Sequence, residues 1–160
     1  MVWEKNGTPL TLSSTADDID ITDLTAKKFN MFMIHLLPSG NKDAHVTYNN
    51  NGNSVYAHRK SFNGGTDSTN VSDTKWDINL AHTQSEFRIV YLCSISGEEK
   101  LGISFGLDTA ASGAGTTPTR DEFVTKFVPS PDADVTRIDL TNTETGDFAA
   151  NSNVSALGTD

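Results

Sequence analysis

The feature that most constrains the fold of this chain is the alternation of apolar and polar residues with a period of two. The clearest example is residues 101–108, whose apolar members are Leu101, Ile103, Phe105 and Leu107. Successive side chains of a β-strand point to opposite faces of a sheet, so this spacing predicts a strand that buries these apolar residues. Residues 87–95 alternate in the same way, and the polar residues 97–100 supply a turn. The segment from 87 to 107 is therefore predicted to be a β-hairpin.

Short strands are predicted along most of the remaining chain. Residues 29–37 are apolar on both alternate faces, which favours a strand at the centre of the fold, with a short buried helix as the alternative. Thr119 and Glu122 have the spacing of a helix capping box, but Phe123, Thr125 and Phe127 alternate as in a strand, which we favour. Further strand candidates are 8–12, 19–22, 46–49, 55–62, 75–80, 135–140 and 154–157, with long loops predicted at 63–70 and 110–118.

Many short strands, separated by turns every 8 to 12 residues or so, indicate a sandwich or a barrel. A chain of 160 residues is also the size of one domain with one core. We therefore expect residues 1–160 to form a single all-β domain, an antiparallel, jelly-roll-like β-sandwich with little helix.

The charge and apolar runs of the chain exclude some classes of partner. A formal net charge of −9 argues against nucleic-acid binding, because phosphate contacts need clustered Lys and Arg. The compact basic cluster, His58-Arg59-Lys60, is interpreted as a solvated strand surface. The apolar run at 31–37 is far shorter than the roughly 20 residues that cross a bilayer, and the first residues lack a signal-peptide pattern. We expect no nucleic-acid and no membrane partner.

No catalytic or metal-binding motif is evident in the sequence. Cys93 lies in an apolar run and is interpreted as a small buried residue, and His35 as a core histidine. The histidines at 35, 45, 58 and 82 lack the spacing of a zinc site, and the acidic residues near 17–23 and 132–134 lack the calcium-loop pattern. A pocket that held two or more of His35, Asp139, Glu122 and Cys93 would indicate an enzyme instead. We expect no enzyme activity, no metal and no cofactor.

Aromatic residues leave carbohydrate binding open as an alternative function. Trp3, Tyr48, Tyr56 and Trp76 have side chains that stack on sugars in lectin-like sandwiches. Trp76 alternates with Ile78 and Leu80, which favours core packing. An exposed Trp76 beside polar residues would favour a sugar-binding or receptor-binding module.

Turn and strand signatures along nearly the whole chain resemble small β-rich proteins encoded among the virion genes of tailed phages and related environmental viruses. The matching segments are Leu24-Thr25-Ala26-Lys27-Lys28-Phe29, Tyr48-Asn49-Asn50, Asn63-Gly64-Gly65, Gly113-Ala114-Gly115, Pro118-Thr119-Arg120, Thr136-Arg137-Ile138-Asp139, Gly146-Asp147-Phe148 and Leu157-Gly158-Thr159-Asp160. No residue with a catalytic role transfers with this resemblance.

The resemblance implies a virion structural protein, assembled in the host cytoplasm. It would be a capsid decoration (cement) protein on the major capsid protein, or a tail-associated protein, and commonly a homotrimer. The residues expected to contact partners are Val2, Trp3, Glu4, Ser112, Gly113, Ala114 and Gly115, because both segments look incompletely satisfied within one domain.

Overall fold

The computed structural model describes residues 2–78 and 83–160, and these residues form an all-β structure without a helix, as predicted. None of the described residues therefore belongs to a helix that is long and apolar enough to span a membrane. The strands are β1 (Glu4–Lys5), β2 (Leu10–Thr11), β3 (Asp18–Ile21), β4 (Phe29–Leu36), β5 (Pro38–Ser39), β6 (Ala44–Tyr48), β7 (Tyr56–Phe62), β8 (Ser68–Asp73), β9 (Trp76–Asp77), β10 (Glu86–Cys93), β11 (Lys100–Asp108), β12 (Thr119–Phe127), β13 (Ile138–Asn142), β14 (Asp147–Phe148) and β15 (Asn153–Thr159).

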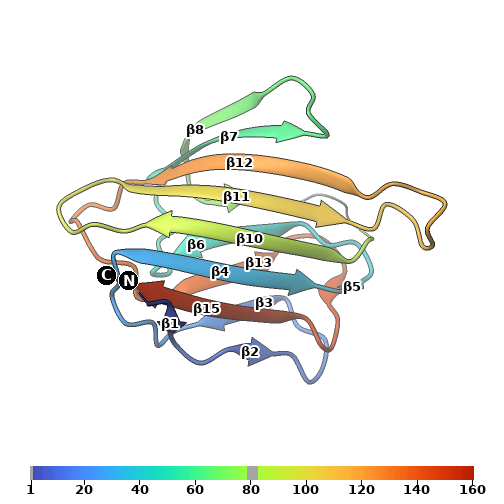
Figure 1. Ribbon diagram of the computed structural model, residues 1–160, viewed down its shortest axis with the longest axis horizontal. Helices are drawn as coiled ribbons and strands as arrows, with labels where there is room; N and C mark the ends of the chain where they lie inside the picture. The colour runs from blue at the N-terminus through green and yellow to red at the C-terminus, as the bar shows by residue number, and fades with distance from the viewer. Residues whose placement is uncertain (1, 79–82) are drawn as a thin grey trace.

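The strands pair antiparallel into two layers that pack as a sandwich (Figure 1). The larger sheet has the order β1-β15-β4-β10-β11-β12-β7-β8, and β2 also pairs with β15. The smaller sheet, β3-β13-β6-β9, covers one face of the larger sheet and lies behind it in Figure 1. A two-stranded ribbon of β14 and β5 joins the layers at one end.

The predicted hairpin is confirmed as β10 and β11, which pair from Glu86↔Asp108 to Cys93↔Leu101. Residues 29–36 form strand β4 rather than a helix, and residues 119–127 form β12 rather than the start of a helix. The prediction of a loop at 63–70 is wrong in part, because strand β8 begins at Ser68. The strand was missed since its residues are mostly polar and do not alternate with apolar ones. The end of the predicted strand 75–80 lies outside the described residues.

The core lies between the two sheets. Aromatic side chains fill its centre, where Tyr48 lies 6.2 Å from Trp76 and 5.6 Å from Phe127 between ring centroids. Aliphatic side chains of both sheets surround this cluster, among them Ile34, Val46 and Leu140. Trp76 is fully buried, as core packing predicts, so it cannot stack on a sugar.

Candidate functional site

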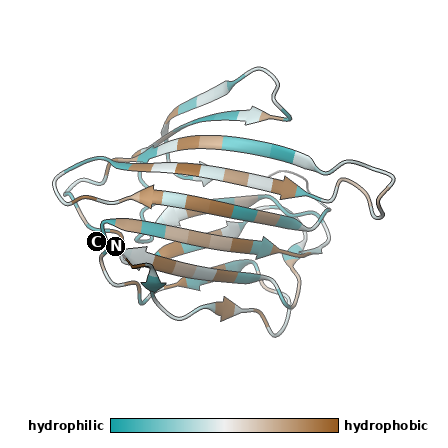
Figure 2. Cartoon of the chain, in the orientation of Figure 1, coloured by the Kyte–Doolittle hydropathy of each residue, from teal (hydrophilic) through white to brown (hydrophobic). Residues whose placement is uncertain are grey.

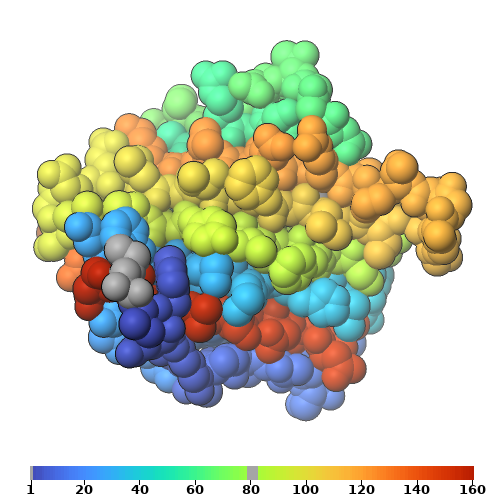
Figure 3. Space-filling view, in the orientation of Figure 1, coloured from blue at the N-terminus to red at the C-terminus, as the bar shows by residue number. Residues whose placement is uncertain are grey.

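The candidate functional surface is the side of the larger sheet that faces away from the smaller sheet, which we call the outer face. Antiparallel pairing places residues of β4, β10 and β11 side by side on it, for example Met33, Ile89 and Phe105. Figure 3 shows this face, with these strands across its middle. The bands of brown in Figure 2 follow the same strands. The large apolar side chains on it that are 39–55% exposed are Phe87, Tyr91, Leu101, Ile103, Phe105, Leu107, Val124 and Trp3.

The prediction that Leu101, Ile103, Phe105 and Leu107 are buried is wrong, because β11 turns its other face to the core. Lys100, Gly102, Ser104, Gly106 and Asp108 are the buried residues of that strand. A period of two identifies a strand but does not say which of its faces another layer will cover. Here Gly102 and Gly106 face the core and leave room for side chains from neighbouring strands. The large residues Leu101, Ile103, Phe105 and Leu107 would not leave this room.

Arg88 explains why β11 is glycine-rich on its inner side. A Cβ atom on Gly106 would lie 2.4 Å from Nη2 of Arg88, closer than real contacts allow. The guanidinium is fully buried and donates hydrogen bonds to Glu86 Oε1 (3.0 Å), Ser104 Oγ (2.7 Å), Asp121 Oδ2 (2.8 Å) and the Ile78 carbonyl (2.7 Å). Buried charges of this kind are stable when they are paired and hydrogen-bonded.

The buried charges extend beyond Arg88. Lys42 Nζ lies 3.2 Å from Glu86 Oε2, and both side chains are fully buried. We call the set Lys42, Glu86, Arg88 and Asp121 the buried charge cluster. Through Arg88 it links β10 to β11 and β12, and so it connects three strands of the sheet that carries the outer face. Nothing in the sequence pattern predicted it.

Burial raises the pKa of Asp121 to about 6, although the charge and hydrogen bond of Arg88 act to lower it. The folded protein therefore favours the protonated carboxyl, and this contribution to stability is complete below pH 3.8 and lost as pH rises through about 6. Relative to an Asp121→Asn variant, we expect the wild type to lose about 2–3 kcal/mol of unfolding free energy between pH 4 and 7. Urea unfolding of both proteins across this range measures the difference.

The comparison with Asp121→Asn removes the contributions of other groups. Burial lowers the pKa of His58, which favours its neutral form and costs stability as pH falls, opposite in sign to Asp121. Burial also raises the pKa of Asp20. Both groups are present in the two proteins, so their effects cancel in the difference. A difference that stays constant from pH 4 to 7 would contradict the assignment to Asp121.

The predicted partner contacts lie at the two ends of the outer face. Val2, Trp3 and Glu4 are exposed, and Trp3 lines an apolar groove of about 400 Å³ together with Phe29, Tyr91, Leu101 and Ile103. Residues 112–115 are also exposed, but their loop projects beyond the opposite end of the sheet (Figure 1). The structure therefore joins the N-terminal segment to the apolar surface and leaves the loop separate from it.

The four residues whose presence in one pocket would have indicated an enzyme lie apart. Three of them, His35, Cys93 and Glu122, are spread over the outer face. His35 is exposed, which makes its prediction as a core residue wrong, and it pairs in register with Phe87. Cys93 is half-buried rather than buried and lies at the other end of β10, opposite Phe29. Glu122 is exposed on β12, and Asp139 lies on the smaller sheet, where it pairs with Arg137. These residues form no common pocket.

Of the remaining described histidines, His58 packs against an aromatic ring and His45 lies among charged groups. His58 is buried 6.0 Å from the Phe123 ring, so its prediction as a solvated residue is wrong. His45 Nε2 lies 3.4 Å from Asp43 Oδ1 and 3.6 Å from Asp77 Oδ1. Lys75 Nζ lies 2.9 Å from His45 Nδ1, and Lys60 Nζ lies 3.2 Å from Asp77 Oδ2. Two ammonium groups thus already occupy the surroundings in which a cation would bind. His82 lies outside the described residues.

Comparisons of the chain with protein-family models, with curated proteins and with solved structures find no match.

Proposed function

We propose that the protein is a virion structural protein, a capsid decoration protein that binds the shell of a virus particle as an oligomer. The observation that supports this proposal is the apolar outer face. The eight exposed side chains on it together present on the order of 700 Å² of apolar surface, if each exposes about half of a typical large side chain. Exposed patches above roughly 300–600 Å² on a single chain mark interaction sites.

The character of the outer face favours a protein partner over a soluble polar ligand. Its groove is lined by apolar side chains, including Phe29, Tyr91 and Leu101. A sugar site needs polar groups beside its aromatic ring to bind hydroxyls. The full burial of Trp76 also removes the residue on which the carbohydrate alternative depended.

A role in a particle lattice also fits the rigid framework behind this face. The buried charge cluster and the aromatic core link the strands behind the face by many contacts, and a preorganised surface loses little conformational entropy when it is covered. Many copies on a symmetric shell then add their contacts, so each contact can be weak. The Ser112–Gly115 loop, which lies apart from the outer face, is the proposed contact with the major capsid protein or a tail protein, and Trp3 of the Val2–Glu4 segment contacts the partner that covers the outer face.

The test is the location of the protein on purified virus particles from its source, imaged after labelling with an antibody against the chain. We expect label spread over the shell. Antibody that has been absorbed with the purified chain is the control and must leave the particles unlabelled. Label confined to the tail would replace shell decoration by a host-contact role, and unlabelled particles would overturn the proposal.

A further inference from the structure

We propose that the outer face binds the outer face of a second copy of this chain, so that the protein forms a two-fold symmetric dimer. This inference deepens the proposed function, on which it rests, by naming the partner that covers the apolar surface. In the dimer the two larger sheets pack face to face and the two smaller sheets lie outermost.

The uncharged strip on the outer face is the surface at which two copies of this acidic chain can meet. The chain carries a net charge of −9, so two copies repel each other at most orientations. The outer positions of β4, β10 and β11 form a strip without carboxylate or ammonium groups. Apart from His35, Tyr91 and Cys93, every residue at these positions is apolar. An identical copy can approach this strip without placing two carboxylates or two ammonium groups against each other.

The charged residues beside the strip are already paired within the chain. On the side of β12 and β7, Arg59 pairs with Asp67 at 3.0 Å and Lys126 pairs with Glu99 at 3.1 Å. Arg120 lies 3.4 Å from Glu122 on the same edge. On this side of the strip the described charges are therefore balanced, and a partner of opposite charge is not required there.

The area and form of the strip suit a two-fold contact. About 700 Å² of apolar surface per copy is close to the roughly 800 Å² per partner of a standard stable interface. A single continuous patch can pair with itself around a two-fold axis, whereas a ring of three copies needs two different patches on each chain. Sheets that pack face to face by apolar side chains are also the ordinary way in which sandwiches form.

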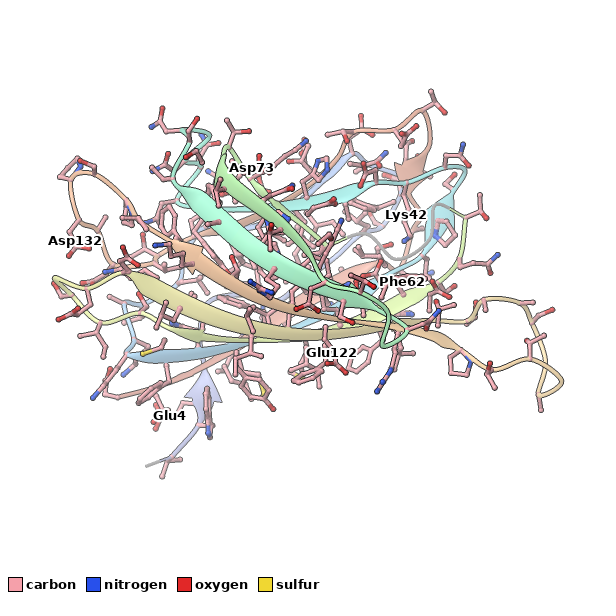
Figure 4. The ribbon with its side chains drawn as sticks, turned by 90° about the horizontal axis from the view of Figure 1, so that it is seen from above. Glu4, Lys42, Phe62, Asp73, Glu122 and Asp132 are labelled. Carbon is pink, nitrogen blue, oxygen red and sulfur yellow. The ribbon has the colours of Figure 1, made fainter. Side chains whose placement is uncertain are left out.

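Phe105 and Phe62 provide a matched pair of variants. Phe105 is 52% exposed on the outer face, and Phe62 is 48% exposed on the opposite side of the same sheet. Residues that pair in register point to the same side of a sheet. Phe62 pairs with the buried Asp121 and so lies on the inner side, whereas Phe105 pairs with the exposed Glu122 on the outer face. Figure 4 shows Phe62 and Glu122 on opposite sides of the larger sheet. A change of either phenylalanine to threonine keeps a strand-forming residue and removes a similar exposed area.

The experiment is sedimentation velocity on the full chain from about 1 to 100 μM, a range that detects micromolar dimers. We expect a mass of twice 17.3 kDa for the wild type and for Phe62→Thr. Phe105→Thr should raise the dissociation constant at least about 10-fold, as loss of a central aromatic contact does, with an unchanged circular dichroism spectrum. A single-chain mass at all concentrations, a three-fold mass, or equal weakening by both variants would overturn the proposal.

Failure of this inference and failure of the proposed function are distinguishable. A chain that is a monomer in solution but labels the viral shell would mean that a different subunit covers the outer face, and only the dimer would be wrong. A chain that forms the dimer but is missing from particles would leave the dimer standing and overturn the virion function.

Discussion

Replacement of Arg88 by methionine is expected to lower the free energy of unfolding by about 3–5 kcal/mol at pH 7, the usual cost of removing one partner from a buried ion pair. Methionine fills much of the volume but leaves Asp121 Oδ2 without the guanidinium that lies 2.8 Å away. Glu86 keeps Lys42 as a partner at 3.2 Å. Guanidinium chloride unfolding, followed by tryptophan fluorescence, measures the loss.

Two comparisons make this prediction specific to burial. Arg59→Met removes an arginine from a pair whose side chains are largely exposed, so we expect a loss of at most about 1 kcal/mol. The loss for Arg88→Met should also be smaller at pH 5 than at pH 7, because Asp121 is then protonated and needs no cation. Equal losses for Arg88→Met and Arg59→Met would contradict the role of the buried charge cluster.

Replacement of Trp76 by alanine is expected to cost about 3–5 kcal/mol, as large-to-small changes of buried aromatics do. The indole is fully buried and lies 6.2 Å from the Tyr48 ring and 6.4 Å from the Phe123 ring. Its Nε1 has no hydrogen-bond partner among the described residues. Trp76→Phe should therefore lose far less, since it keeps an aromatic ring and removes no hydrogen bond. Urea unfolding at low protein concentration measures both variants.

Trp3→Ala is the control for position, because Trp3 lies on the outer face and is 40% exposed. We expect little change in the stability of the single chain and weaker association. If Trp76→Ala left stability unchanged and abolished binding to a glycan, the core assignment would be wrong and the carbohydrate alternative would return.

The sequence predicts the elements of this fold better than their orientation. The β10–β11 hairpin and β12 follow from alternation and turn residues, and β4 follows from a short run that is apolar on both faces; all of these are local properties. Alternation does not reveal which face of β11 meets a second layer, and on this strand the inner face is the less apolar one. The inner row of β11 holds the charged residues Lys100 and Asp108 beside the small residues Gly102 and Gly106, so hydropathy alone assigns that row to the surface.

The candidate site could be predicted only in part for the same reason. Trp3 was expected to contact partners from its position, and it does lie on the outer face. The expected contacts at 112–115 stay a prediction. The strip on which the proposed function rests was misassigned to the core, because an exposed apolar row alternates with its neighbours just as a core-facing row does.

The most direct test of the account is hydroxyl-radical footprinting of the purified full chain at concentrations where it sediments as a dimer. Tyr91, Phe105 and Phe62 are 43%, 52% and 48% exposed in the single chain, so exposure alone predicts similar oxidation. We expect Tyr91 and Phe105 to be strongly protected relative to Phe62, and to lose that protection on dilution. Oxidation of all three in proportion to their exposed fractions at every concentration would show that the outer face meets solvent, and would contradict the account.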